Sequence, residues 1–131
     1  MSQVQRPLSP HLQIWRWQMN MALSILHRAS GIASALGALL LVWWVSAIAL
    51  GPDYYEFFRS VMGSFIGRLV LFGVTLAVMA HLMTGIRHLL MDTGRLLEKD
   101  SAARIGPWLL LGALVLTLVV WAGAYHFAGL L

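Results

Sequence analysis

The chain has 131 residues, of which 60% are hydrophobic and 11% are charged, and its mean hydropathy is +0.77. This composition is too apolar for a soluble domain of this length and indicates an integral membrane protein. The formal net charge of +4 does not indicate a nucleic-acid partner, because the basic residues lie at the ends of the apolar segments instead of forming one cluster.

Three stretches of the sequence are long and apolar enough to cross a bilayer. Charged side chains are absent for 24, 18 and 27 consecutive residues after Arg28, Arg68 and Arg104. A hydrocarbon core about 30 Å thick requires roughly 20 helical residues, and arginines at the ends of a shorter run can extend to the aqueous surface. We therefore predict an all-α integral membrane bundle in a single domain (residues 1–131), with transmembrane helices at about 21–50, 61–91 and 105–128.

Residues 1–20 form a polar and aromatic arm ahead of the first helix. Pro7 and Pro10 disfavour helical backbone at the residues before them, so we expect the arm to run extended or turned. Trp15 and Trp17 flank Arg16, a pattern typical of an interfacial anchor with rings at the level of the lipid headgroups. The arm is therefore predicted to lie at the membrane surface.

The first turns of the first helix carry a polar face. Its members are spaced i, i+3, i+4 and i+7 and so lie on one side of a helix: Ser24, His27, Arg28 and Gly31. A hydroxyl, an imidazole and a guanidinium at the membrane edge can bind a polar headgroup or an anionic propionate. The alternative, in which Ser24 caps locally and Arg28 pairs with lipid phosphate, stays open on these residues alone.

The two connections between the helices differ in charge and predict the topology. We expect a short loop with an aromatic interfacial turn at residues 51–60, and a charged, solvated connection at 92–104. Seven of the nine basic residues precede the first helix or surround the second connection, whereas only Arg59 and Arg68 lie near the first. The positive-inside rule therefore predicts that the N-terminus and the second connection face the cytoplasm.

The end of the second helix carries the most informative residues, because ionisable groups are costly inside a bilayer. At 100° per residue, Gly85, His88 and Asp92 lie about 40°, −20° and 20° around the helix from His81. Two imidazoles, a glycine and a carboxylate therefore share one stripe, with Arg87 beside it. This coincidence of positions favours a binding site over isolated packing residues.

A neutral imidazole at the depth of His81 suits a transition metal or a haem iron. A catalytic zinc ion would require three protein ligands in one place, which the sequence does not offer. His88 lies about 10 Å along the helix axis from His81, so the two cannot approach one iron from opposite faces at about 2 Å. We expect His88 at the edge of the cofactor or at its propionates, where Arg28 and Arg87 supply cations.

The second axial ligand is missing from the second helix. Met83 projects about 200° around the helix from His81 and cannot face the same iron. His27 is a further candidate, but its position in the first turns of a helix places it nearer the membrane surface than His81. Three helices are also few for enclosing a haem. We therefore expect the second ligand to be a histidine of another membrane subunit.

Two multi-residue motifs resemble the signatures of the succinate dehydrogenase cytochrome b subunit family, and together they span residues 6–92. The first motif consists of Arg6-Pro7-Leu8, Leu12, Met19 and Ser24-Ile25-Leu26-His27-Arg28-Ala29-Ser30. The second consists of His81, Gly85-Ile86-Arg87-His88-Leu89 and Met91-Asp92. The arm resembles the alphaproteobacterial or mitochondrial branch of the family, although Trp15 stands where we would expect tyrosine.

The resemblance implies one of two small membrane anchors of succinate:quinone oxidoreductase (respiratory complex II), which joins the tricarboxylic acid cycle to the respiratory chain. In this family a flavoprotein oxidises succinate and an iron–sulfur protein passes electrons toward the membrane. Ubiquinone is reduced where the iron–sulfur subunit meets the two anchors, and haem b lies between the anchors. The absence of cysteine from this chain agrees with the division, because cysteine-ligated clusters then belong to a partner.

The resemblance also implies roles for individual residues, none of them catalytic. His81 matches the axial haem ligand, with the other axial histidine on the sister anchor. Ser24 and Arg28 match quinone-site residues, and Arg28 also lies near a haem propionate. His27 and His88 match the haem surroundings.

Asp92 matches a carboxylate near the quinone pocket in the same family. Ubiquinone needs a donor to each carbonyl and a route for two protons, and a cytoplasm-facing carboxylate can contribute to that route. The expected location is the bacterial inner membrane, in preference to the mitochondrial one, with membrane lipid around the helices.

Three alternatives differ in function. A fumarate reductase anchor would serve the reverse reaction, because sequence motifs do not fix the direction. A haem-free structural anchor would use His81 as a packing residue that is hydrogen-bonded between helices. A small transporter or channel subunit would require ionisable groups through the full membrane thickness, whereas here they cluster near the cytoplasmic half, so we rank it well below the others.

Overall fold

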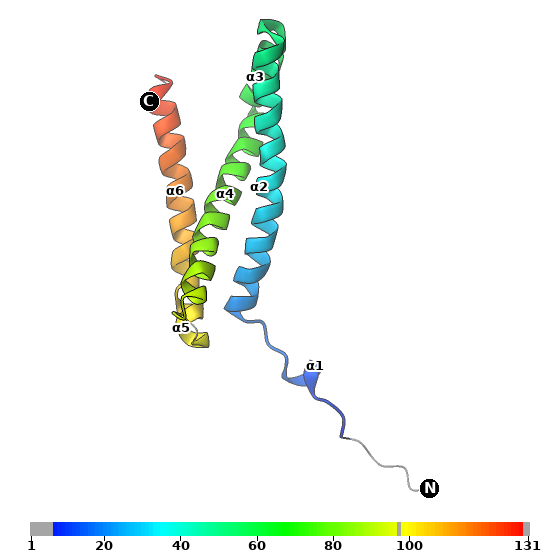
Figure 1. The fold of residues 1–131 in the computed structure, drawn as a ribbon, viewed down its shortest axis with the longest axis vertical. Coiled ribbons are helices and arrows are strands. Elements are labelled where there is room, and N and C mark those ends of the chain that lie inside the picture. Colours follow the sequence, from blue (N-terminus) through cyan, green and yellow to red (C-terminus); the bar gives the residue numbers. More distant parts are fainter. Residues whose placement is uncertain (1–6, 97, 130–131) are drawn as a thin grey trace, which may run out of the picture.

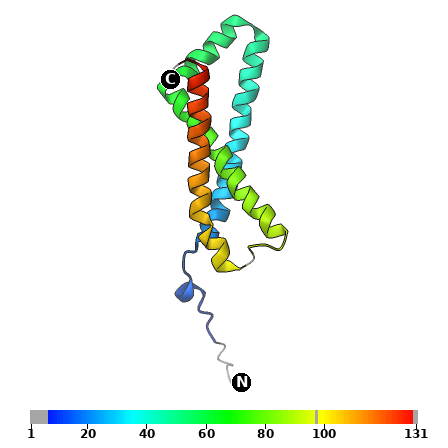
Figure 2. The ribbon, with the colours of Figure 1, turned by 90° about the vertical axis from the view of Figure 1, so that its left-hand side faces the viewer.

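The computed structural model describes residues 7–96 and 98–129 as a bundle of helices (Figure 1). Arg6, part of the first motif, lies outside the described residues. The one-turn helix α1 (His11–Ile14) lies in the N-terminal arm, which runs away from the bundle (Figure 2). The other helices are α2 (Met19–Leu50), α3 (Pro52–Gly63), α4 (Phe65–Asp92), α5 (Lys99–Arg104) and α6 (Gly106–Phe127).

Three helical stretches are long and apolar enough to cross a membrane, namely Met19–Leu50, Phe65–Asp92 and Asp100–Phe127. The predicted all-α fold with three transmembrane helices is therefore confirmed. The first of these helices begins two residues before the expected start at residue 21, and the second begins four residues after the expected residue 61.

Helix α4 is the central element of the bundle. It packs against α2 on one side and against α6 on the other, whereas α2 and α6 touch each other only slightly (Figure 1). Since α2 and α4 run antiparallel, the first turns of α2 lie beside the last turns of α4. The segments that carry the two sequence motifs of the helices therefore meet at one end of the bundle.

Small residues allow the helices to approach closely. The most buried hydrophobic side chains are mainly alanines, with Leu23 and Leu109 as the larger members. A Cβ atom at Gly37 of α2 would overlap the side chain of Val74 of α4. Many larger apolar side chains, such as Leu39, point outward instead, as expected of helices that face lipid or another membrane subunit.

The short loop with an interfacial turn predicted at residues 51–60 is instead a complete helix, α3, from Pro52 onward. Gly51 has a φ of 113°, which favours glycine and ends α2. Pro52 then begins α3 with its fixed φ, and Asp53 lies in the positively polarised first turn. Trp43 of α2 packs edge-on against Phe58, with ring centroids 4.9 Å apart. Aromatic packing on α2 thus holds a helix where the sequence indicated a turn.

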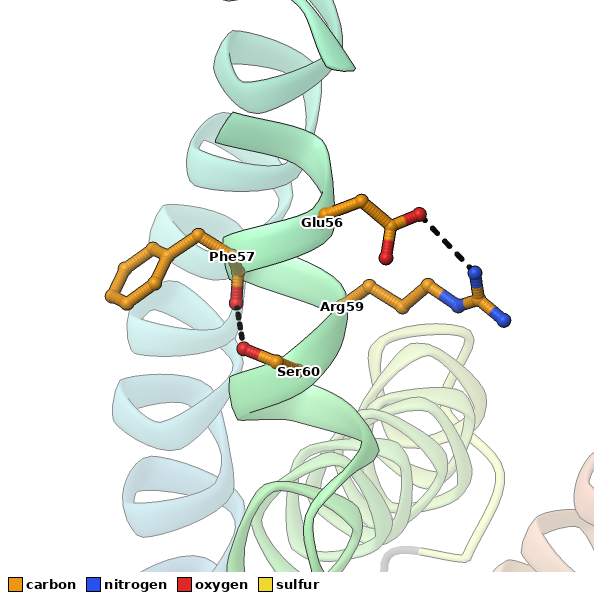
Figure 3. Close-up of polar contacts among 4 residues, drawn as sticks. All are labelled: Glu56, Phe57, Arg59 and Ser60. Atoms are coloured by element: carbon orange, nitrogen blue, oxygen red, sulfur yellow. Dashed lines mark hydrogen bonds and ion pairs between the residues drawn. The ribbon is translucent and has the colours of Figure 1, made fainter. Parts of the chain in front are cut away.

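The face of α3 that points away from α2 is polar. Arg59 donates a hydrogen bond to Glu56 at 3.2 Å, and Ser60 Oγ donates to the carbonyl of Phe57 at 2.7 Å (Figure 3). The Arg59 and Glu56 side chains are 69% and 64% exposed, so this ion pair contributes little to stability. Figure 3 shows the Phe57 ring on the other side of the helix. Such an amphipathic helix suits the membrane interface.

The second connection also contains a short helix, α5, where a solvated loop was expected. Ala102 of α5 is only 2% exposed, because this turn packs against α2 and α6. Pro107 lies in the first turn of α6, where its fixed φ suits the start of a helix.

Candidate functional site

Three imidazoles gather between α2 and α4. The ring of His27 stacks on that of His81, with centroids 4.1 Å apart and an interplanar angle of 9°. The ring of His88 lies 4.8 Å from that of His27 at a tilt of 55°. The antiparallel packing thus joins the polar face of α2 to the histidine stripe of α4. With ring centroids only 4.1 Å apart, any difference in membrane depth between the His27 and His81 rings is small.

Two glycines line the rings. A Cβ atom at Gly31 would lie 3.0 Å from Cε1 of His81, which is closer than ordinary van der Waals contact. At Gly85 the added atom would lie 3.6 Å from Cε1 of His27, an ordinary contact distance. The His81 ring therefore packs directly on the backbone of α2 at Gly31, and of the two glycines only Gly31 could not gain a Cβ atom without a small shift of a neighbouring ring.

The hydrogen bond of His81 fixes its tautomer. Nδ1 of His81 lies 3.1 Å from the main-chain carbonyl oxygen of His27. Since a carbonyl oxygen can only accept, Nδ1 carries the proton and donates it. In the neutral imidazole the lone pair is then on Nε2, the arrangement that metal-binding histidines use.

Thr84 is a site residue that the sequence analysis missed. It is 1% exposed, and its Oγ1 lies 2.8 Å from Nδ1 of His27. The same hydroxyl donates to the carbonyl oxygen of Ala80 at 2.6 Å. A threonine in an apolar helix carries little signal in a sequence, because its hydroxyl usually bonds within its own helix. Only the packing of α2 on α4 reveals the contact with His27.

Arg87 is buried instead of facing the histidine stripe. It is 3% exposed, and its Nη2 donates to Oδ1 of Asn20 at 2.9 Å. Its Nε is buried with no hydrogen-bond partner among the described residues. The prediction that Arg87 supplies a cation to a cofactor stays a prediction. The guanidinium instead joins the last turns of α4 to the first turn of α2.

The other predicted site residues lie at the same end of the bundle but apart from the rings. Ser24 is half-buried on α2, Arg28 is exposed one residue after His27, and Asp92 is exposed at the last residue of α4. Within the described residues, no hydrogen bond or ion pair joins any of these three side chains to the imidazoles. The structure thus brings together the three histidines and leaves Ser24, Arg28 and Asp92 outside the cluster.

Few side chains of this chain are available to ligate a metal at the imidazole cluster. A Cβ atom at Gly112 of α6 would lie 2.8 Å from Cε of Met83, so Met83 faces α6, away from α2, as its helical position predicted. In the part of the chain that the structure describes, no three His, Cys, Asp or Glu side chains form a group that could hold a metal ion. A haem iron would need fewer ligands from the protein, because the porphyrin supplies the rest, and His81 could provide one of them.

The fold and the cluster define a small membrane protein with three spanning helices and a group of imidazoles between the first two. The succinate dehydrogenase/fumarate reductase transmembrane subunit family matches residues 2–121 of this chain. The succinate dehydrogenase cytochrome b556 subunit of Paracoccus denitrificans is 37% identical over 119 residues, which cover 88% of this chain and 92% of that protein.

Two further relatives are subunits of the same enzyme. The cytochrome b556 subunit of Rickettsia felis succinate dehydrogenase is 33% identical over 116 residues, covering 88% of this chain and 90% of that protein. The mitochondrial cytochrome b560 subunit of Sus scrofa is 38% identical over 94 residues, covering 69% of this chain and 54% of that protein. The chain therefore belongs to the succinate dehydrogenase/fumarate reductase transmembrane subunit family. It is a membrane-anchor subunit of the succinate dehydrogenase type, as the two motifs predicted.

Proposed function

We propose that this chain is one of two membrane anchors of a succinate:ubiquinone oxidoreductase, and that it holds haem b through His81. The observation that carries the proposal is the hydrogen bond from His81 Nδ1 to the His27 carbonyl at 3.1 Å, because it leaves Nε2 free to ligate iron. A bound haem supplies a one-electron carrier. The close approach of His81 to Gly31 holds the imidazole in place before any ligand binds.

The second axial ligand comes from the sister anchor in this proposal. Two axial histidines on one iron direct their Nε2 atoms toward each other from opposite sides. The rings of His27 and His81 instead lie face to face at 4.1 Å, a geometry in which they cannot serve one iron from opposite sides. In this proposal His27 packs against the ring of His81 and does not ligate the iron. His88, whose ring is tilted against that of His27, belongs to the surroundings of the haem.

The polar groups outside the cluster support ubiquinone binding. Arg28 is exposed next to His27, and Ser24 lies one turn earlier on the same helix. A guanidinium and a hydroxyl can each donate a hydrogen bond to a quinone carbonyl oxygen. Asp92, exposed at the same end of the bundle, provides a carboxylate through which protons can reach the reduced quinone.

The partners and the location follow from the same proposal. The chain has no cysteine, so an iron–sulfur subunit delivers the electrons that a flavoprotein subunit takes from succinate. Arg16 in the arm, Arg95 before α5 and Arg104 at the end of α5 lie toward the cluster end of the bundle, which supports a cytoplasmic N-terminus in the bacterial inner membrane. The relatives named as succinate dehydrogenases favour succinate oxidation over fumarate reduction.

The quinone role can be tested with Arg28→Ala in the purified complex. We expect succinate-dependent reduction of ubiquinone to fall about tenfold or more, because a hydrogen bond from a charged group contributes about 1.5–3 kcal/mol. Reduction of a soluble dye at the headpiece should stay near the wild-type rate. Arg95→Ala, which changes an exposed arginine in the second connection, is the control and should alter neither activity.

Two outcomes would contradict this part of the account. Equal loss of both activities in Arg28→Ala would mean that the arginine supports assembly and not quinone chemistry. A wild-type complex that reduces the dye with succinate but never reduces ubiquinone would overturn the proposed function itself.

A further inference from the structure

Thr84 lies at the back of the imidazole cluster, where neither sequence motif includes it. It is the third residue after His81 on α4 and is 1% exposed. Its hydroxyl has two close neighbours, the carbonyl oxygen of Ala80 at 2.6 Å and Nδ1 of His27 at 2.8 Å. The carbonyl oxygen of His81 is more distant, at 3.3 Å.

The Thr84 hydroxyl has one proton, and the two distances show which neighbour accepts the hydrogen bond from it. Two oxygen atoms 2.6 Å apart repel each other unless a proton lies between them, and a carbonyl oxygen has none to give. The Thr84 hydroxyl therefore donates to Ala80, and its own oxygen accepts. The partner of that oxygen, Nδ1 of His27, must carry a proton and donate it. Thr84 thus fixes the neutral tautomer of His27 with the lone pair on Nε2.

The contacts of His27 extend this constraint to His81. The ring of His27 covers the face of the His81 ring at 4.1 Å, nearly parallel to it. The main-chain carbonyl oxygen of His27 accepts a hydrogen bond from Nδ1 of His81. His81 is therefore fixed through its ring nitrogen by the backbone of His27 and through its ring face by the side chain of His27. That side chain is itself held by Thr84.

We propose that Thr84 is a positioning residue for His81, acting through the ring of His27. The consequence for haem rests on the proposed function, in which His81 is an axial ligand. Groups that hold a ligating histidine set its ring orientation and its basicity, and these in turn tune the reduction potential of the iron. Removing the Thr84 hydroxyl should free the His27 ring and alter the haem that His81 binds.

The test compares three variants of the purified complex. Thr84→Val removes the hydroxyl at nearly constant shape, and Thr84→Ser restores it. Thr117→Val is the matched control, because Thr117 is fully buried and its hydroxyl also donates to the carbonyl four residues earlier, at 2.8 Å, but on α6. The readouts are the midpoint potential of haem b from a redox titration and the g values of the ferric haem in electron paramagnetic resonance spectra.

We expect Thr84→Val to shift both the midpoint potential and the g values, or to lose haem, while Thr84→Ser and Thr117→Val stay close to wild type. Thr84→Val indistinguishable from wild type would overturn the inference. So would equal changes in Thr84→Ser, because the hydroxyl would then not be the cause. These outcomes are separate from the test of the proposed haem ligand, which fails if His81→Ala retains an unchanged haem.

Discussion

At the scale of single residues, the main-chain carbonyl of His27 connects the α2 side of the imidazole cluster to the α4 side. It accepts a hydrogen bond from Ser30 Oγ at 3.0 Å and from His81 Nδ1 at 3.1 Å. A ligating histidine needs such a partner for its second ring nitrogen. Here the partner belongs to the backbone of another histidine, so the position of one imidazole depends on the helix that carries the other.

Gly31 is the residue that permits this contact, and its substitution gives a sharp prediction. In Gly31→Ala the new Cβ atom would lie 3.0 Å from the His81 ring, so the ring or the helix must move. Such overpacking typically costs about 1–3 kcal/mol. We expect the purified complex to hold less haem b or to show a shifted reduced spectrum.

Gly85→Ala is the matched comparison, because its Cβ atom would meet His27 at an ordinary distance of 3.6 Å. This variant should bind haem as the wild type does. If Gly31→Ala and Gly85→Ala gave the same haem content and spectrum, close packing of His81 on α2 would have no part in haem binding.

The sequence identified the three clustered histidines but not the atoms that connect them. Their spacing on each helix placed His81 and His88 on one stripe, and His27 on a polar face. The depth of His27, the contact with Thr84 and the burial of Arg87 all depend on how far α2 slides along α4 and how it rotates. Those quantities arise from small residues along the whole interface, such as Gly37 against Val74, and no local pattern encodes them.

At the scale of helices, the long apolar elements were predictable and the connections were not. Length without charge is sufficient to indicate a transmembrane helix. Gly51-Pro52-Asp53 is a sequence typical of a turn, but the same residue types also end one helix and begin the next. Because α2 has 32 residues and is about 48 Å long, it exceeds the hydrocarbon core of about 30 Å. Its end therefore has room to pack against α3 near the interface.

The two connections should lie on opposite sides of the membrane, and the chain suits a direct test because it has no cysteine. Ser60→Cys in α3 and Thr93→Cys after α4 each place one thiol at an exposed position. With an impermeant maleimide added to intact spheroplasts, we expect labelling of Ser60→Cys and no labelling of Thr93→Cys until the membrane is opened. The reverse pattern would contradict the cytoplasmic position of the imidazole cluster.

At the scale of the whole molecule, the chain leaves its site partly open. His81 and His88 are only half-buried, and three helices do not surround them. A cavity of about 460 Å³ further along the α2–α4 interface is lined mainly by apolar side chains, among them Leu41 and Val74. These features fit an anchor that is completed by a second membrane subunit.

The central claim is that His81 ligates haem b, and a dithionite-reduced minus oxidised absorption spectrum of the purified complex tests it most directly. The wild type should show a b-type signal that weakens or shifts in His81→Ala, while the chain still inserts into the membrane. His126→Ala, an exposed histidine at the last turn of α6, should keep the wild-type spectrum. An unchanged signal in His81→Ala, or no b-type signal in the wild type, would contradict the account.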